Sequence, residues 1–291
     1  MHNQRFFDQT LDLINNGAVH IAVPLLIGQL HHAYADPVRW AETRDALHQH
    51  ALHPVLMQDP LAAHSASKPR GYAGDAGLID LIYDMQPPEG VSDLARQFFA
   101  STVMYQAPEA VRQRRIEAER LVAEASKAGE SVLVLACGHF REGDTLNGPE
   151  LGNFTLVDQD ELSVSRVRKC HGDHLNVVEA NVFKYLSEAA RESRTFDLIY
   201  TLGLTDYLDT RAMQLLHRLM KGCLAPGGRI VLANFVPHHL SIGWMEAVMD
   251  WQLIYRDEAE LEGYAREIGL TPKTWRDPTD SVVWCEMTER R

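Results

Sequence analysis

The hydrophobic period of the chain changes at Ser131, and this change constrains the fold more than any other feature. Before it, apolar residues recur at helical spacing; after it, short apolar runs alternate with helical segments. The runs are 131–136, 154–157, 176–179, 196–201 and 229–235, separated by helical patterns at 162–169, 183–190 and 210–224. Such runs are typical of strands buried on both faces, so the alternation predicts a parallel sheet with crossover helices.

The last forty residues follow a different pattern. A helical segment at 257–268 precedes two strand-like segments, 272–275 and 281–287, which are joined by a turn at Asp277-Pro278. Strands joined so tightly must be antiparallel. We therefore predict an α/β fold with a Rossmann-like, parallel seven-stranded sheet that ends in an antiparallel C-terminal hairpin.

The N-terminal part has helical periodicity and little strand signal. Helices are expected around Phe6–Ile14 and at 20–34, after Asp36-Pro37, and at 78–83, 92–99 and 108–127. These helices are short and the 54–77 stretch is irregular, so the segment would have difficulty building a core of its own. We predict a helical cap region over residues 1–115 and a catalytic domain over residues 116–291.

Composition excludes several kinds of partner. The formal net charge is −12, and an acidic surface repels a phosphate backbone, so nucleic acid is not expected as a substrate. No apolar run reaches the roughly 20 residues of a membrane span, and Met1–Asp12 lacks a signal-peptide core. We expect a cytoplasmic protein that acts on a small molecule; a homodimer is compatible with these features.

Neither the cysteines nor the histidines form a convincing ligand pattern. The 4 cysteines lie far apart and include no CxxC pair, which disfavours a disulfide framework or a zinc knuckle. Among the clustered histidines only His50 and His53 share a helix face, and His53 precedes a proline. No metal is predicted.

Small residues follow the first predicted strand. Ligands of open α/β sheets bind at the C-terminal strand ends, where the strand order reverses. Ala136, Cys137 and Gly138 would let a ligand approach the backbone closely. The loop keeps Gly138 and Gly143 but lacks the GxGxxG pattern of dinucleotide-binding proteins, so an ordinary strand–helix turn is an equal alternative.

The next two strand ends carry hydrogen-bonding side chains. Asp158 and Gln159 follow the second strand, where a carboxylate can accept both hydroxyls of a ribose. A helix N-cap is the alternative, and it suits Asp160 better than Asp158. Asn181 and Val182 follow the third strand, where the amide can bind an adenine edge while the apolar residue packs on the ring. Here too an N-cap is the alternative.

The order of these segments carries a family resemblance. VLVLACG, LVDQD, EAN, FDLIYTLGLTDYL and LAPGGRIVLANF, all within residues 130–235, together resemble class I S-adenosylmethionine (SAM) dependent methyltransferases. The LxPGG turn before a strand is frequent in that family. The resemblance implies SAM as the cofactor and S-adenosylhomocysteine as the product. The sequence departs from the family at Ala136, where a glycine is usual, and at Phe140, near another.

The resemblance also implies roles for individual residues. Ala136, Cys137 and Gly138 would line the methionine end of SAM, and Asp158 would bind the ribose. Asn181 would lie at the adenine, and Thr201 or Leu202 under the sulfonium. Two further segments, 68–83 (KPRGYAGDAGLIDLIY) and 245–261 (MEAVMDWQLIYRDEAEL), are similar to segments of bacterial methyltransferases of 3-hydroxypalmitic acid methyl ester biosynthesis. That group includes enzymes of other specificity.

The 68–83 segment is the candidate lid. Gly71 and Gly74 flank Tyr72 and precede Asp75, so a bent backbone can aim a phenol and a carboxylate inward. Arg70 beside them is a candidate substrate-binding residue. The alternative is a surface turn in which Asp75 caps the next helix.

A second candidate wall lies in the 245–261 segment. Trp251 and Tyr255 are four residues apart, which places them on one helix face, and core packing is an equal alternative to a substrate pocket. Arg256 can pair with a substrate carboxylate. A salt bridge from Arg256 to Asp257 or Glu260 is the alternative.

Tyr207 and His238, each just after a predicted strand, complete the candidate catalytic set with Tyr72 and Asp75. Methyl transfer from a sulfonium mainly requires orientation, and a base is needed only where the acceptor loses a proton. We predict transfer to S, N or O of a small polar metabolite such as an amino acid. The alternatives are carboxyl O-methylation of a hydroxy fatty acid, a SAM-binding regulator without catalysis, and an NAD-dependent dehydrogenase, which the missing GxGxxG disfavours.

Overall fold

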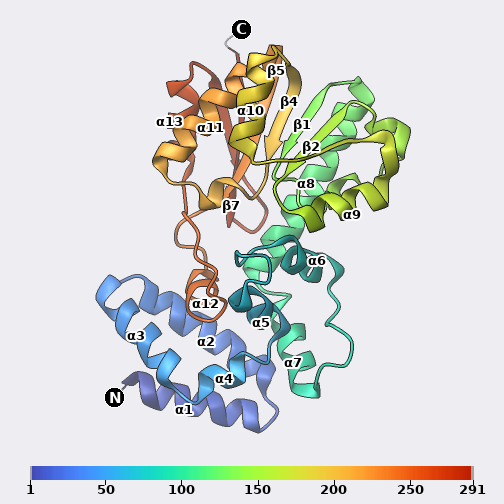
Figure 1. Ribbon diagram of the computed structural model, residues 1–291. Coiled ribbons are helices and arrows are strands. Elements are labelled where there is room, and N and C mark those ends of the chain that lie inside the picture. The colour runs from blue at the N-terminus through green and yellow to red at the C-terminus, as the bar shows by residue number, and fades with distance from the viewer. Residues whose placement is uncertain (1, 290–291) are drawn as a thin grey trace. The chain divides into compact units, whose positions relative to one another are not determined.

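A computed structural model describes residues 2–289 of the chain (Figure 1). The chain divides into two compact units. The helical unit contains the residues up to Arg112 together with His238–Gln252. The sheet unit contains Gln113–Pro237 and the residues from Leu253 onward. Each unit is thus built from two separate stretches of sequence.

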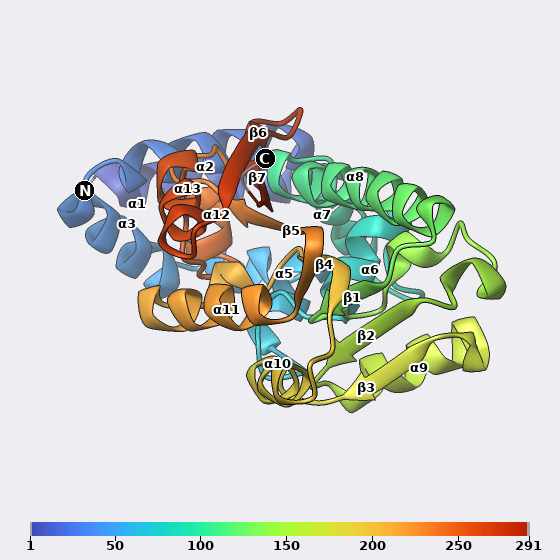
Figure 2. The same cartoon turned by 90° about the horizontal axis from the view of Figure 1, so that it is seen from above.

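The sheet unit contains a seven-stranded sheet in the order β3-β2-β1-β4-β5-β7-β6, which Figure 2 shows from above. The first five strands are parallel, and β7 runs antiparallel to both β5 and β6. The predicted sheet and its C-terminal hairpin are therefore confirmed. The strands are β1 Val132–Leu135, β2 Phe154–Asp158, β3 Asn176–Glu179, β4 Phe196–Thr201, β5 Leu224–Phe235, β6 Thr271–Arg276 and β7 Val282–Thr288.

Apolar side chains cover both faces of the central strands. All residues of β1 are buried, which is why its sequence is a continuous apolar run. On one face Leu133, Leu135 and Ile199 pack into a core with residues of α10, α11 and α13. The helices of this unit are the second part of α8 Gln106–Ala128, α9 Glu161–His171, α10 Val182–Arg191, α11 Thr210–Gly222 and α13 Glu258–Glu267, with short 3-10 turns η1 Arg141–Gly143, η2 Gly148–Leu151, η3 Gly172–His174 and η4 Thr205–Tyr207.

The LxPGG segment is not a separate turn before the fifth strand. It forms the start of β5, where Leu224 pairs with Phe196 and the register then shifts before Arg229 pairs with Leu198. Gly227 has a positive φ of 78°. A Cβ at Gly228 would lie 2.9 Å from the carbonyl oxygen of Asp197. The glycine pair therefore permits a bulge inside an extended strand.

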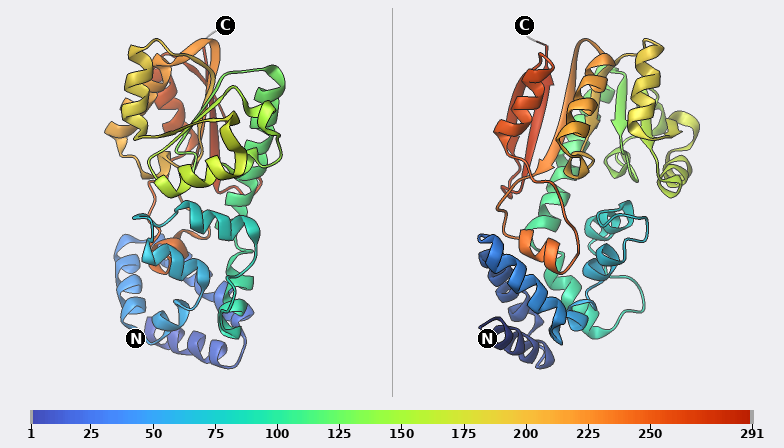
Figure 3. Two further views of the ribbon diagram at one scale, coloured as in Figure 1. Left: turned by 45° about the vertical axis from the view of Figure 1, so that its right-hand side comes forward. Right: turned by 60° about the vertical axis from the view of Figure 1, so that its left-hand side comes forward.

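The helical unit is arranged around α2. Its helices are α1 His2–Asn15, α2 Val19–Tyr34, α3 Pro37–Gln49, α4 Leu52–Leu56, α5 Pro60–Ser67, α6 Ala76–Asp84, α7 Asp93–Thr102, the start of α8, and α12 Ile242–Ala247. Helix α2 packs against α1, α3, α7 and α12 (Figure 3). A Cβ at Gly243 of α12 would lie 2.7 Å from the Leu30 carbonyl carbon of α2, so glycine permits this close approach. Among the described residues, no helix has both the length and the apolar character needed to cross a membrane.

The segment after α12 differs from the sequence prediction. Trp251 and Tyr255 do not share a helix face, because residues 248–257 are not helical. In the sheet unit the backbone N–H of Ile254 donates to the Asp206 carbonyl at 2.7 Å, and that of Arg256 donates to the Phe235 carbonyl at 3.0 Å. These hydrogen bonds hold the segment beside the end of β5 and replace the bonds that a helix would make.

Candidate functional site

The carboxyl ends of β1 and β2 are connected through Asp158, the last residue of β2. One of its carboxylate oxygens accepts the backbone N–H of Gly138 at 2.8 Å, and the other accepts that of Asp160 at 2.9 Å. The strand order reverses between β1 and β4, so this edge is the topological switch point where ligands of such sheets bind. The structure thus brings two of the predicted cofactor residues, Gly138 and Asp158, into direct contact.

The loop after β1 contains three residues in the left-handed region. The φ angles of Ala136, Gly138 and Phe140 are 53°, 52° and 49°. For a non-glycine residue this conformation costs roughly 1–2 kcal/mol, and such strain gathers at functional sites. The Phe140 ring is buried, and it leaves no room for a Cβ at Gly143, which would lie 2.2 Å from the ring. Phe140 therefore packs inward, and this explains how the loop accommodates an aromatic residue at this position.

Asp158 has no cationic partner among the groups that influence its charge. Burial raises the pKa of Asp158, backbone N–H donors lower it, and the Asp160 carboxylate raises it further. Burial likewise raises the pKa of the neighbouring Cys137 thiol, with Asp158 adding to the effect. A carboxylate has about four acceptor positions, and the backbone donors occupy only part of them. Asp158 thus retains capacity to accept further donors such as hydroxyls.

Asn181 is the N-cap of α10, which was the alternative to its adenine role. Its side-chain oxygen accepts the N–H groups of Phe183 and Lys184 at 3.0 and 3.3 Å. The side-chain nitrogen donates to Gln159 at 3.4 Å, so these two exposed predicted residues lie together. Val182 is buried in the core. In this N-cap position the exposed amide nitrogen of Asn181 lies at the carboxyl edge of the sheet. The role of Asn181 in binding adenine stays a prediction.

The carboxyl end of β4 contributes a buried hydroxyl. Thr201 is fully buried, and among the described residues no group forms a hydrogen bond with its Oγ1 atom. The next residue, Leu202, is partly exposed. Sequence analysis missed the neighbouring pair Tyr200 and Glu142, in which the phenol donates to the carboxylate at 2.9 Å. Burial raises the pKa of Glu142. Because Tyr200 lies within the apolar run of β4, its polar role had no sequence signal.

Arg256 is a structural residue of the sheet unit. Its side chain is 2% exposed and donates to the Thr205 carbonyl at 2.7 Å and to Asn234 Oδ1 at 3.2 Å, and also to the Leu208 carbonyl. The predicted salt bridge to Asp257 or Glu260 is not among these contacts, and a role of Arg256 in binding a substrate carboxylate stays a prediction. Tyr255 is partly buried and Tyr207 is exposed. Their substrate and catalytic roles stay predictions.

A second buried arginine, Arg114, faces the same loop and was missed. Its guanidinium lies 3.8 Å from the Asp206 carboxylate and 5.9 Å from the centre of the Phe235 ring. Asp206 also accepts the Phe235 N–H at 2.8 Å. Burial raises the pKa of Asp206 to about 6, and Arg114 opposes that rise. In the sequence Arg114 stands among charged residues, between Arg112 and Arg115 and before Glu117, so the local pattern does not indicate that its side chain is buried.

In the helical unit, Asp75 is both a helix cap and the hydrogen-bond partner of a histidine. Its Oδ1 atom accepts the Leu78 N–H at 2.9 Å and the His64 Nε2 at 2.7 Å. Burial favours a higher pKa for Asp75, but the His64 hydrogen bond, the Leu78 N–H and the charges of His64 and Arg70 hold the pKa below its usual value. The cap alternative is observed. A lid role for Arg70, Tyr72 and Asp75 stays a prediction.

The remaining predicted residues of the helical unit differ in exposure. His238 is exposed and has a positive φ of 69°, whereas its neighbour His239 is buried. Burial, with a contribution from His31, lowers the pKa of His239 to about 3, so this ring is neutral at physiological pH. Trp251 is buried as a core residue would be. A catalytic role for His238 stays a prediction.

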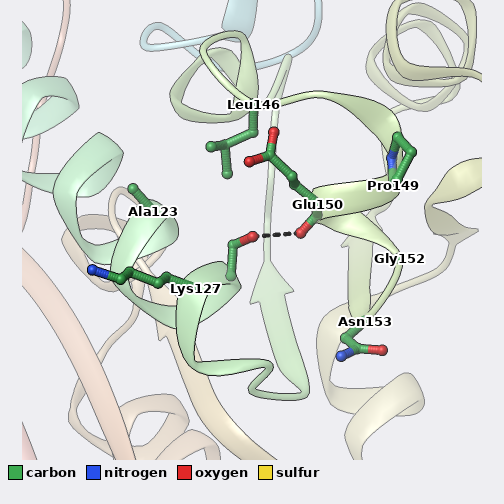
Figure 4. A pocket seen from close by; sticks show the side chains of 8 residues that line it. Ala123, Lys127, Leu146, Pro149, Glu150, Gly152 and Asn153 are labelled. Carbon is green, nitrogen blue, oxygen red and sulfur yellow. Dashed lines mark hydrogen bonds between the residues drawn. The ribbon is translucent and has the colours of Figure 1, made fainter.

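A surface hollow of about 450 Å³ in the sheet unit is a different site (Figure 4). It is lined by Ala123, Ser126, Lys127, Leu146, Pro149, Glu150, Gly152 and Asn153. The Ser126 hydroxyl donates to the Glu150 carbonyl at 2.6 Å across it. These residues precede β1 and β2, so the hollow lies toward the amino ends of the parallel strands. Ligands of such sheets bind at the opposite ends.

Comparison with known proteins supports the fold. The sequence matches no known family profile and no curated protein. A crystal structure of a possible exported protein from Bordetella parapertussis matches with a TM-score of 0.61 at 20% identity, covering 90% of this chain and 97% of that one. Magnesium protoporphyrin IX methyltransferase from Synechocystis, with bound S-adenosylhomocysteine, matches with a TM-score of 0.50 at 11% identity, covering 78% of this chain and 98% of that one. The chain is structurally similar to class I SAM-dependent methyltransferases, and its fold is methyltransferase-like.

Proposed function

We propose that this protein is a SAM-dependent methyltransferase that methylates S, N or O of a small polar metabolite, with an amino acid or a related compound as the leading acceptor. The observation that carries the proposal is Asp158. It is a buried carboxylate at the switch point of a methyltransferase-like sheet, it is joined to the strained loop after β1, and it has acceptor capacity to spare.

The residues at this edge fit SAM. Asp158 would accept the ribose hydroxyls, and the exposed pair Gln159 and Asn181 would border the adenine. Ala136, Cys137 and Gly138 would line the methionine end, and Leu202 would lie near the sulfonium. The buried Thr201 hydroxyl, which has no hydrogen-bonding partner among the described residues, offers a further donor at this edge. Dinucleotides fit less well, because the loop lacks the three-glycine pattern that cradles a pyrophosphate.

The chemistry requires little of the side chains beyond binding and orientation. When bound, SAM supplies a methyl group on a positively charged sulfur. Asp158 and the loop after β1 would hold the donor, so that only one direction of approach remains for the acceptor. Orientation of this kind can supply roughly 7–11 kcal/mol of the barrier. Tyr72, Asp75, Tyr207 and His238 are the candidates for positioning the acceptor and excluding water.

The test is calorimetric titration of SAM into the wild-type protein and into the Asp158→Ala variant. Loss of charge-assisted ribose contacts should weaken binding by about 1.5–3 kcal/mol. Asp160→Asn is the matched control, because asparagine still caps α9 and should leave SAM affinity nearly unchanged. Equal SAM affinity in the wild type and in Asp158→Ala would contradict the proposed binding site.

A second candidate function is carboxyl O-methylation of a hydroxy fatty acid. The similarity of segments 68–83 and 245–261 to methyltransferases of 3-hydroxypalmitic acid methyl ester biosynthesis favours it. The two candidates predict different products from the wild-type protein and labelled SAM. An amino-acid acceptor gives a methylated zwitterion that remains in water, and a fatty acid gives an ester that extracts into organic solvent.

A further inference from the structure

Two buried arginines, Arg256 and Arg114, lie near the loop after β4. They differ in how many hydrogen bonds they donate. Arg256 donates to carbonyl oxygens of Thr205 and Leu208 and to Asn234. Arg114 is 7% exposed, yet within residues 2–289 its nearest carboxylate, Asp206, lies 3.8 Å away and no group accepts a hydrogen bond from it. Arg256 thus donates hydrogen bonds to protein acceptors, whereas the N–H donors of Arg114 remain available.

The guanidinium of Arg114 keeps some contact with solvent, because none of its nitrogens belongs to the fully buried side-chain atoms that lack a hydrogen-bond partner. It carries five N–H donors, and withdrawing such a group from water without partners opposes folding. Asp206 balances part of its charge, and the Phe235 ring adds a cation–π contact. Neither interaction uses the planar fork of donors, which suits a carboxylate. Asp206 and the nearby Glu142 thus balance its charge, whereas within residues 2–289 no group accepts a hydrogen bond from its N–H donors.

The surroundings of Arg114 leave the fork uncovered. A Cβ on Gly203 would lie 3.9 Å from both terminal nitrogens of the guanidinium, so a larger side chain would contact and cover it. Gly203 follows β4 directly after Thr201 and Leu202, the residues assigned to the sulfonium. Asp206 and Phe235 place Arg114 toward β5, whereas Asp158 lies at β2, on the other side of β1. Arg114 therefore lies on the acceptor side of the proposed donor site.

We propose that Arg114 binds a carboxylate of the methyl acceptor, with Gly203 leaving room for it. The inference rests on the proposed function and narrows the acceptor to a small molecule with an anionic carboxylate that is separate from the methylated atom. The same donors could take the carboxylate of the methionine part of SAM, so the experiment has one arm for each source.

In the first arm, S-adenosylhomocysteine is titrated into the wild-type protein and into Arg114→Gln. Binding to the wild type tests the proposed function separately. We expect Arg114→Gln to change this affinity less than about threefold. A loss of about 10- to 150-fold, the range for a hydrogen bond to a charged group, would mean that Arg114 binds the donor, and would overturn the inference.

In the second arm, the protein saturated with S-adenosylhomocysteine is titrated with α-amino acids and short hydroxy acids, each beside its decarboxylated counterpart, for example cysteine with cysteamine and histidine with histamine. We expect at least one acid to bind more tightly than its counterpart, and Arg114→Gln to weaken that acid about 10- to 150-fold. If no acid binds more tightly than its counterpart, the inference is wrong.

Two variants separate a binding role from a folding role. Arg115→Gln alters the adjacent arginine, whose partners are Glu119 and Asp144, and should leave acid binding unchanged. Arg114→Lys keeps the charge but loses the fork, and should restore only part of the affinity. Full acid binding by Arg114→Lys and Arg114→Gln alike, with both variants folded, would contradict the proposal.

Discussion

Asp158 in the sheet unit and Asp75 in the helical unit are both buried, but their charges are balanced differently. Asp158 accepts only backbone N–H groups, and burial raises its pKa. Asp75 adds His64 as a partner at 2.7 Å, and its pKa is lowered. Burial by itself therefore does not decide the pKa of a carboxylate, because hydrogen-bond donors and nearby charges also act on it. Asp75 thus has a side-chain partner within its own unit, whereas the donors to Asp158 are backbone N–H groups.

The largest expected effect follows from how the helical unit is built. Helix α12 comes from residues 242–247, yet it packs against α2 through Gly243. A fragment of residues 1–115 lacks this helix, so the apolar face of α2 would be exposed. We expect the fragment to show no cooperative thermal transition by circular dichroism. A sharp transition would mean that the region which surrounds Asp75 folds without α12.

Substitution of the two aspartates should separate structural from ligand-binding roles. Asp75→Ala removes the α6 cap and the His64 bond, and should cost about 3 kcal/mol in the free energy of unfolding. Asp75→Asn keeps the cap and should cost less. Asp158→Asn keeps only one of the two acceptor oxygens and places its amide nitrogen against a backbone N–H, so it should cost about 1–2 kcal/mol, less than Asp75→Ala. Urea denaturation measures all three; a larger stability loss for Asp158→Asn than for Asp75→Ala would break the comparison.

Asp59, a third buried aspartate, sharpens the comparison through its pH dependence. It caps α5 and accepts the Thr102 hydroxyl, and burial raises its pKa to about 7. The pKa of Asp59 in the unfolded chain is about 3.9. Because the folded-state pKa is higher, the contribution of Asp59 to stability is complete when the pH is below the unfolded-state pKa. The contribution is lost as the pH rises through about 7.

Asp59→Asn keeps the cap and removes the titration. Relative to this variant, the wild-type protein should lose up to about 1.4 kcal/mol of stability per pH unit between roughly pH 4 and 7. The pH dependence of the Asp75 contribution has the opposite sign. Because the folded-state pKa of Asp75 is lowered, its contribution to stability is complete above the unfolded-state pKa and is lost as the pH falls through the folded-state pKa. Parallel stability curves for wild type and Asp59→Asn from pH 4 to 7 would refute the burial argument.

The smallest structural effect is expected at Tyr72. Tyr72→Phe removes one hydroxyl from a partly buried side chain and should change the melting temperature little. If the 68–83 segment secludes the reacting groups, kcat/KM for the acceptor should fall about tenfold, which corresponds to ~1.4 kcal/mol. Asp75→Asn tests the same role in the neighbouring carboxylate. Wild-type turnover by both variants would leave Tyr207 and His238 as the remaining predicted catalytic residues.

Local patterns predicted the fold well, and they placed the candidate site residues Gly138 and Asp158 at neighbouring strand ends. The apolar runs indicated β1 to β4 because a strand buried on both faces requires apolar residues throughout. The carboxyl ends of parallel strands meet at one edge, so Asp158 and Gly138 could be expected near each other from their strands alone. The bulge at the start of β5 and the non-helical segment 248–257 could not be predicted in this way, because they depend on backbone hydrogen bonds to residues distant in the sequence.

The sequence by itself determined the sheet, the hairpin and the edge at which the strand-end residues meet, because these depend on periodicity and chain order. Only the tertiary structure decided which charged side chains find hydrogen-bond partners within the protein. The sequence favoured Arg256 as a ligand-binding arginine, yet Arg256 donates hydrogen bonds to the Thr205 carbonyl and to Asn234, whereas Arg114 lies 3.8 Å from the Asp206 carboxylate and donates no hydrogen bond within residues 2–289. The partners of a buried charge come from strands and helices far away along the chain, and no local pattern records them.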